Sequence, residues 1–122
     1  MHHILVVEDE VDTQEIVSGL LEHFDISAEI VGSAEEAWQL LEKSRYEAIV
    51  IDLGLPGIDG LSFLRNIRSN EATASLPCMI ITAYNSSLVK KEALEIGCDA
   101  YLAKPLEHHY FVQEIIRMVN TK

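Results

Sequence analysis

Four short apolar segments punctuate the chain, and a polar residue follows each of them. The segments and the residues that follow them are 4–7 with Glu8 and Asp9, 48–51 with Asp52, 78–81 with Thr82, and 100–103 with Lys104. Runs of this length, bounded by turn signals and separated by helix-length stretches, are typical of strands buried on both faces of a parallel sheet. The carboxyl ends of such strands all lie at one edge of the sheet, where ligands bind. We therefore expect these polar residues to converge on one small site.

Helical periodicity marks the stretches between the apolar segments. Residues 12–24 carry apolar side chains at helical spacing and are expected to form the first helix. Ser33, with Glu36 three residues later, forms a capping box that opens a second helix. Gly97 ends a helical stretch that begins after Ser86, and it fits a glycine C-cap. The apolar stripe expected to face the core from the first helix consists of Ile16, Val17, Leu20, Leu21 and Phe24.

The order of these elements predicts the fold. A less apolar segment, residues 28–31, supplies a fifth strand, a third helix follows the turn-rich loop 53–60, and the last helix follows Pro105. Five strand–helix units predict an α/β fold, a flavodoxin-like (βα)5 three-layer sandwich with a five-stranded parallel sheet in the order 2-1-3-4-5. The chain length indicates a single domain.

Composition narrows the functional classes. Apolar residues make up 48% of the 122 residues, which argues against disorder, and no apolar stretch approaches the length of a membrane span. The formal net charge of −11 argues against direct binding to nucleic acid, because phosphate backbones repel such a surface. Cys78 and Cys98 are interpreted as buried, reduced thiols of a cytoplasmic protein, with a disulfide or redox switch as the alternative.

The polar residues at the strand ends indicate phosphate chemistry. Adjacent carboxylates such as Glu8 and Asp9 resist burial unless a cation offsets them, and Asp52 would add a third negative charge that Lys104 alone cannot neutralise. Mg²⁺ suits this site because it binds carboxylates and keeps positions open for phosphate oxygens, and Mn²⁺ is a candidate substitute. Asp52 is placed to act as a nucleophile, while Thr82 and Lys104 can hold phosphoryl oxygens.

Four segments, taken together, resemble a known family. They are Ile4-Leu5-Val6-Val7-Glu8-Asp9-Glu10, Asp52-Leu53-Gly54-Leu55-Pro56-Gly57-Ile58-Asp59-Gly60, Ile80-Ile81-Thr82-Ala83 and Gly97-Cys98-Asp99-Ala100-Tyr101-Leu102-Ala103-Lys104-Pro105. In order and spacing they are similar to the response-regulator receiver domains of bacterial two-component phosphorelays. The likeness covers essentially the whole chain, which predicts one receiver domain over residues 1–122 with no output domain.

The resemblance implies a role for each site residue. Asp52 would accept a phosphoryl group from a histidine kinase phosphohistidine, a phosphotransfer protein or a small acyl phosphate. Thr82 and Lys104 would hold the phosphoryl oxygens, and the Lys104–Pro105 peptide bond would be cis. The implied Mg²⁺ ligands are Asp9 directly, Glu8 through water, Asp52, and the carbonyl oxygen of Gly54.

A switch follows from the same chemistry. A phosphoryl group on Asp52 adds charge and acceptor oxygens that should draw the Thr82 hydroxyl toward it. Tyr101 could then rotate into the vacated space, as the resemblance also implies, unless it is only a structural aromatic. The rearrangement would reach the face formed by the last two helices and the strand between them, where an unknown downstream protein or a second copy of the chain binds. The chain would be a cytoplasmic signalling switch rather than an enzyme, catalysing only its own phosphorylation and dephosphorylation.

Three alternatives compete with this hypothesis. A flavodoxin-like electron carrier is disfavoured because Glu8, Asp9 and Glu10 would repel the flavin phosphate. A phosphohydrolase that uses an aspartyl phosphate usually has a second aspartate two residues after the nucleophile, where this chain has Gly54. A phosphorylation-independent interaction module of the same fold is the remaining alternative, and the complete set of polar residues at the strand ends argues against it.

Overall fold

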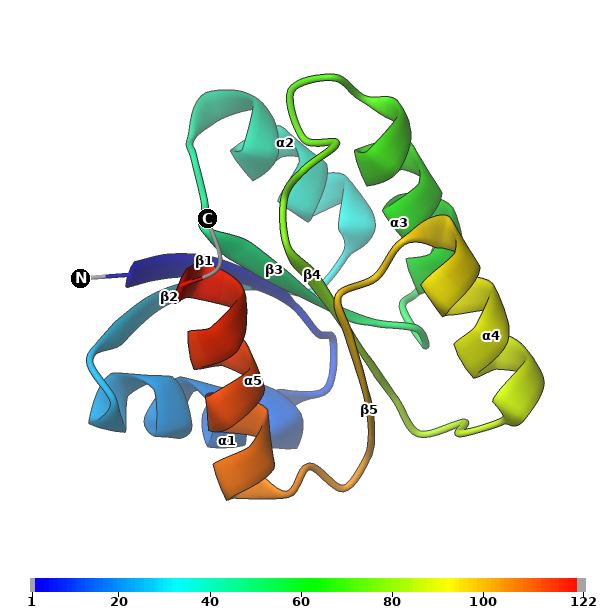
Figure 1. The fold of residues 1–122 in the computed structure, drawn as a ribbon. Helices are drawn as coiled ribbons and strands as arrows, with labels where there is room; N and C mark the ends of the chain where they lie inside the picture. The colour runs from blue at the N-terminus through cyan, green and yellow to red at the C-terminus, as the bar shows by residue number, and fades with distance from the viewer. Residues whose placement is uncertain (1, 121–122) are drawn as a thin grey trace.

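The computed structural model describes residues 2–120, in which five parallel strands form one sheet in the order β2-β1-β3-β4-β5 (Figure 1). The strands are β1 (His2–Val7), β2 (Ile26–Val31), β3 (Ala48–Asp52), β4 (Cys78–Thr82) and β5 (Ala100–Ala103). The helices are α1 (Val11–His23), α2 (Ala34–Lys43), α3 (Gly60–Ser69), α4 (Ser87–Ile96) and α5 (His108–Asn120). The predicted fold class and strand order are confirmed.

Helices cover both faces of the sheet, so the molecule has two hydrophobic cores. Figure 1 shows α1 and α5 on one face and α2, α3 and α4 on the other. Side chains alternate along a strand, so Ile4 and Val6 of β1 enter one core while Leu5 and Val7 enter the other. Every residue of β3 and β4 is buried, which explains why these segments read as uninterrupted apolar runs.

Side-chain caps define the helix boundaries. Ser33 Oγ accepts a hydrogen bond from the Glu36 amide at 3.2 Å and donates one to the Glu36 carboxylate at 3.1 Å. Ser86 Oγ accepts from the Val89 amide at 3.1 Å, which starts α4. Gly97 ends α4 with a φ of +118°, a left-handed conformation that glycine adopts without steric cost. The three caps expected from the sequence are therefore present.

The core face of α1 is narrower than predicted. Val17 and Leu21 are buried, but Ile16 and Phe24 are each 46% exposed, so their placement in the core was wrong. Ile16 lies about 100° around the helix from Val17, which turns it away from the sheet. Phe24 follows the last helical residue and packs edge-on against the His23 ring instead.

Arg68 of α3 ties together the loops at the amino edge of the sheet. Its guanidinium donates to the carbonyl oxygen of Gly97 twice, at 2.8 and 2.9 Å, and to those of Ala74 and Leu76 at 3.1 and 2.7 Å. It also pairs with the Asp99 carboxylate at 3.1 Å. Because charged donors make the stronger hydrogen bonds, this one side chain holds the C-terminal end of α4 against α3.

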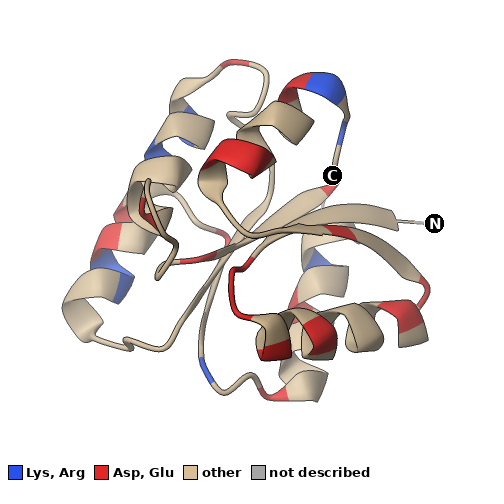
Figure 2. Cartoon of the chain, turned by 180° about the vertical axis from the view of Figure 1, so that it is seen from behind, with Lys and Arg blue, Asp and Glu red and all other residues tan. Residues whose placement is uncertain are grey.

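Charge and thiols complete the description. Figure 2 shows acidic residues gathered along α1 and in the loop that follows β1. The chain has 20 acidic against 9 basic residues, and α1 carries three of the acidic ones, Asp12, Glu15 and Glu22. Cys78 and Cys98 are free and buried, as expected. Within residues 2–120, none of the helices combines the length and apolar character that a membrane crossing requires.

Candidate phosphoryl-transfer and metal site

The polar residues that end the apolar runs meet at the carboxyl edge of the sheet. Asp52 and Thr82 are the last residues of β3 and β4, while Glu8 and Lys104 directly follow β1 and β5. One carboxylate oxygen from each of Glu8, Asp9 and Asp52 lies within 4.8 Å of the other two. The parallel sheet thus brings together polar residues that are far apart in the sequence, from Glu8 to Lys104. The sequence pattern predicts this convergence.

Lys104 bridges two of the three carboxylates. Its Nζ lies 2.7 Å from Glu8 Oε1 and 3.2 Å from Asp52 Oδ2. Burial raises the pKa of Glu8, which is completely enclosed, and the ion pair with Lys104 partly opposes that rise. Burial by itself would lower the pKa of Lys104, but the neighbouring Glu8 and Asp52 carboxylates raise it. The ammonium is therefore firmly held in its charged form between two acids.

The loop after β1 presents Asp9 to solvent. Glu8 Oε2 accepts a hydrogen bond from the Glu10 amide at 3.0 Å, which curls the loop around the buried carboxylate. Asp9 is exposed, and its side chain makes no hydrogen bond or ion pair within residues 2–120. Asp9 is consequently the member of the cluster most accessible to an incoming cation.

Asp52 points into the same cluster from β3. Its side chain is 7% exposed, and its Oδ1 accepts a hydrogen bond from the Gly54 amide at 3.1 Å. A Cβ atom added at Gly54 would lie 3.8 Å from Oδ1, an ordinary contact, so the absence of a side chain there is not a steric requirement of the fold. Both carboxylate oxygens of Asp52 therefore have a partner, the Gly54 amide for Oδ1 and Lys104 Nζ for Oδ2.

Thr82 and Tyr101 connect the site to α4. Thr82 is buried, and its Oγ1 accepts a hydrogen bond from the Tyr84 amide at 2.9 Å, leaving the hydroxyl proton available for donation. The Tyr101 ring packs against the core shared by α2, α3 and α4, and Lys90 Nζ lies 5.9 Å from its centroid. The Tyr101 hydroxyl oxygen is buried without a hydrogen-bond partner within residues 2–120. The Lys104–Pro105 peptide bond is cis, the isomer that the resemblance implies.

These groups form a set that suits a divalent cation and a phosphate. Three converging carboxylates provide the hard oxygen ligands that Mg²⁺ prefers, and the exposed side of Asp9 leaves room for water and phosphate oxygens. An ammonium and a hydroxyl on the next two strands can balance the charge of further phosphate oxygens. The cluster could hold a metal ion, and it is the one group of three or more such ligands found among the described residues.

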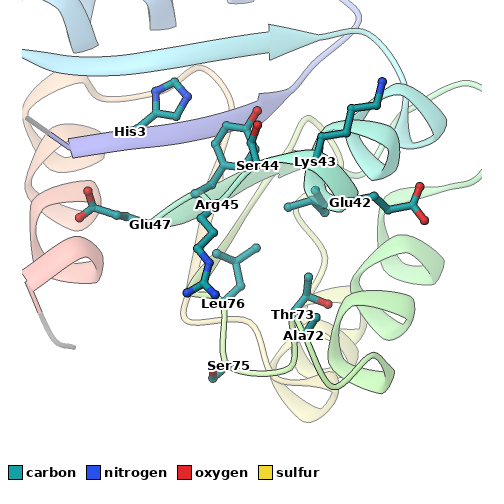
Figure 3. A pocket seen from close by; sticks show the side chains of 12 residues that line it. His3, Glu42, Lys43, Ser44, Arg45, Glu47, Ala72, Thr73, Ser75 and Leu76 are labelled. Carbon is teal, nitrogen blue, oxygen red and sulfur yellow. The ribbon is translucent and has the colours of Figure 1, made fainter.

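A larger cavity than the one beside the cluster lies elsewhere, at the amino end of the sheet. It measures about 820 Å³ and is lined by residues of the segments 41–47 and 72–76 together with His3, as Figure 3 shows. None of the three clustered carboxylates lines it. A second hollow of about 420 Å³ opens beside Lys104, where Ile16 of α1 faces Pro105 and Leu106. The smaller hollow, rather than the larger, belongs to the candidate site.

One residue at the site carries no distinctive signal in the sequence. Gln14 of α1 donates from Nε2 to the carbonyl oxygen of Glu8 at 2.5 Å. A glutamine in the first turns of an amphipathic helix reads as an ordinary surface residue, so its contact with the acidic loop could be found only from the structure.

Comparison with known proteins establishes the family. Residues 4–116 match the response regulator receiver domain, and the chain belongs to that family. The transcriptional regulatory protein BasR of Escherichia coli is 38% identical over 125 residues, which cover 98% of this chain and 54% of BasR. The response regulator Rre1 of Synechocystis is 31% identical over 105 residues, covering 85% of this chain and 46% of Rre1. The chain thus spans about half the length of these two relatives.

Solved structures of receiver domains share the fold. The receiver domain of the sensor histidine kinase PA1611 from Pseudomonas aeruginosa, determined with a magnesium ion coordinated in its active-site cleft, superposes with a TM-score of 0.89. It is 29% identical and covers 98% of both chains. The receiver domain of the Francisella response regulator 1452 is 28% identical over 100% of both chains, with a TM-score of 0.90.

Proposed function

We propose that this receiver domain accepts a phosphoryl group on Asp52 with the help of Mg²⁺, and that a histidine kinase or a phosphotransfer protein is the donor. One observation carries the proposal: a buried aspartate at the end of β3 shares an ammonium with Glu8 and faces the exposed carboxylate of Asp9. The magnesium ion in the similar receiver domain of PA1611 supports the same choice of metal.

The step itself requires positioning more than covalent help from the protein. An Asp52 carboxylate oxygen attacks phosphorus, the bond from phosphorus to the donor nitrogen breaks, and the leaving imidazole keeps the electron pair. Asp9, Glu8, Asp52 and the Gly54 carbonyl would hold Mg²⁺, which offsets the charge of the phosphoryl oxygens when bound. Lys104 would move from its carboxylate partners to a phosphoryl oxygen.

Thr82 and Tyr101 would report the phosphorylated state. A phosphoryl group brings about −1.5 to −2 units of charge and strong acceptor oxygens, to which the free hydroxyl proton of Thr82 can be donated. Movement of Thr82 loosens its bond with the Tyr84 amide and changes the space beside Tyr101. The unpartnered Tyr101 hydroxyl supports this relay, because a buried hydroxyl is stabilised by any movement that brings it to a hydrogen-bond acceptor.

Two surfaces would carry the partners. The hollow beside Lys104 gives a donor access to the site from the side of α1 and α5. On the other side, the face of α4, β5 and α5 exposes apolar side chains such as Leu88 and Leu94, which suit a downstream protein or a phosphorylation-dependent second copy. In this reading the chain is a cytoplasmic signalling switch, with catalysis restricted to its own phosphorylation and dephosphorylation.

Labelling with acetyl phosphate tests the proposal. The wild-type chain should acquire one acyl phosphate, which is stable in acid and labile in alkali, in the presence of Mg²⁺ or Mn²⁺. It should acquire none in the presence of a chelator. Asp52→Asn should abolish labelling. Asp59→Asn is the matched control, because Asp59 caps α3 through the Ser62 amide at 3.0 Å and asparagine caps equally well. Persistent labelling of Asp52→Asn would refute the assignment, and an unlabelled wild-type chain would favour the phosphorylation-independent module.

A further inference from the structure

Gln14 of α1 holds the acidic loop after β1 through hydrogen bonds on both sides of Asp9. Gln14 Nε2 donates to the Glu8 carbonyl oxygen at 2.5 Å, and the Gln14 amide donates to the Glu10 carbonyl oxygen at 3.0 Å. The same residue therefore binds both sides of Asp9, once through its side chain and once through its main chain. Thr13 adds a hydrogen bond from its hydroxyl to the Glu10 carboxylate at 2.6 Å.

Asp9 depends on this tie because its own side chain is not held. It is exposed and makes no hydrogen bond or ion pair within residues 2–120. The peptide group is planar, so anchoring the Glu8 carbonyl oxygen also sets the orientation of the Asp9 amide. Together with the bond from the Glu10 amide to Glu8 Oε2, this leaves the Asp9 backbone little freedom. The backbone, rather than contacts of the side chain, thus sets the position from which the Asp9 carboxylate extends.

The chemistry of the tether also matches a cation site. A glutamine amide donates a hydrogen bond without adding charge. An arginine or lysine in its place would bring a positive charge to a loop that already has Lys104 nearby, and would compete with a bound cation. Gln14 thus orders the loop while leaving the negative potential of Glu8, Asp9 and Asp52 intact.

We propose that Gln14 is a positioning residue of the metal site, which fixes the Glu8–Asp9 peptide so that Asp9 is preorganised for Mg²⁺. The inference rests on the function proposed above. Residues that orient metal ligands without touching the metal commonly change metal affinity by about 10- to 100-fold when they are replaced. Because this tether acts through one backbone carbonyl, we expect an effect near the lower limit, roughly tenfold.

Direct measurement of Mg²⁺ binding tests the proposal. Gln14→Met keeps the length of the side chain and removes the donor, and it should raise the dissociation constant for Mg²⁺ about tenfold in isothermal titration. Gln39→Met is the matched control, because Gln39 is exposed on α2 and its side chain makes no hydrogen bond within the described residues. Its dissociation constant should equal that of the wild type. Gln14→Ala, which favours the helix, provides a second variant if Gln14→Met does not fold.

Two further readouts separate positioning from simple structural support. In the metal-free protein, the backbone amide resonances of Asp9 and Glu10 should broaden or shift in Gln14→Met, whereas those of β3 and β4 should not. The thermal midpoint without metal should fall by only a few degrees, the scale of one hydrogen bond. Unchanged Mg²⁺ affinity in both Gln14 variants would overturn the inference while leaving the proposed function standing. A wild-type chain that bound no Mg²⁺ would overturn both.

Discussion

Replacing Lys104 by methionine removes the only positive charge in contact with Glu8 and Asp52 among the described residues, and it should destabilise the metal-free protein strongly. With an effective dielectric constant of about 20, Coulomb's law gives roughly 6 kcal/mol for the 2.7 Å contact and roughly 5 kcal/mol for the 3.2 Å contact. Desolvation of the three groups cancels much of this attraction. Removal of one partner of a buried pair typically costs about 3–5 kcal/mol. Because Lys104 is partly exposed, we expect a loss of about 3 kcal/mol near neutral pH.

The loss should depend on pH in a defined direction. Burial raises the pKa of Glu8, and the ion pair with Lys104 is the largest influence that lowers it, so the pKa should rise further in Lys104→Met. The folded variant then binds a proton that the unfolded chain, with an ordinary glutamate, does not bind. Stability therefore increases as the pH falls through the raised pKa of Glu8, and the penalty of the substitution shrinks on acidification.

Urea unfolding in the presence of a chelator, at neutral and mildly acidic pH, measures both effects. Lys91→Met is the matched control, because Lys91 lies on α4 with 76% of its side chain exposed and only a 4.0 Å contact to Glu95. Its free energy of unfolding should stay within about 0.5 kcal/mol of the wild type. A loss below about 1 kcal/mol for Lys104→Met at neutral pH, or a loss that grows on acidification, would show that the ammonium does not stabilise the acidic cluster as described.

Two other predictions concern stability away from the site. Arg68→Met should lower the free energy of unfolding in urea by about 2–3 kcal/mol, because it removes the charged donor from three carbonyl oxygens. Arg65→Met, which breaks an exposed ion pair with Glu92, should lower it by less than about 1 kcal/mol. Equal losses would contradict the role given to Arg68. Burial raises the pKa of Cys78 to about 12 from an ordinary 9.0, so the folded state retains a proton that the unfolded chain loses, and stability should fall as the pH rises above 9.0. Cys78→Val should flatten that alkaline decline between 9.0 and 12, and an unaltered pH profile would argue against it.

The fold was predictable because buried parallel strands leave a strong mark in the sequence. The runs at 48–51 and 78–81 belong to central strands whose two faces are both covered, so every position had to be apolar. Their polar ends identified Asp52 and Thr82 without any knowledge of the loops. The alternation of these strands with helices then predicted that they form a parallel sheet.

Contacts made by backbone groups were not predictable in the same way. Nothing in the residue type of Gln14 or Arg68 indicates which carbonyl oxygens they bind, because those partners belong to loops whose path depends on the assembled sheet. The misplaced Ile16 has a related cause: periodicity identifies an apolar stripe, but its width depends on how the helix rotates against the strands. Sequence patterns thus predict the secondary-structure elements and the residues at strand ends more securely than the rotation of a helix or the contacts of a side chain.

The sheet separates the two layers of the hydrophobic core. Tyr101 belongs to the layer of α2, α3 and α4, whereas its neighbour Leu102 belongs to the layer of α1 and α5. Repacking around the tyrosine ring would therefore involve the layer of α2, α3 and α4 first, whereas the hollow beside Lys104 is lined mainly by α1 and by the segment that leads into α5. The hollow proposed as the entrance for a phosphate donor and the core side chains around the Tyr101 ring therefore belong to different layers, separated by the five-stranded sheet.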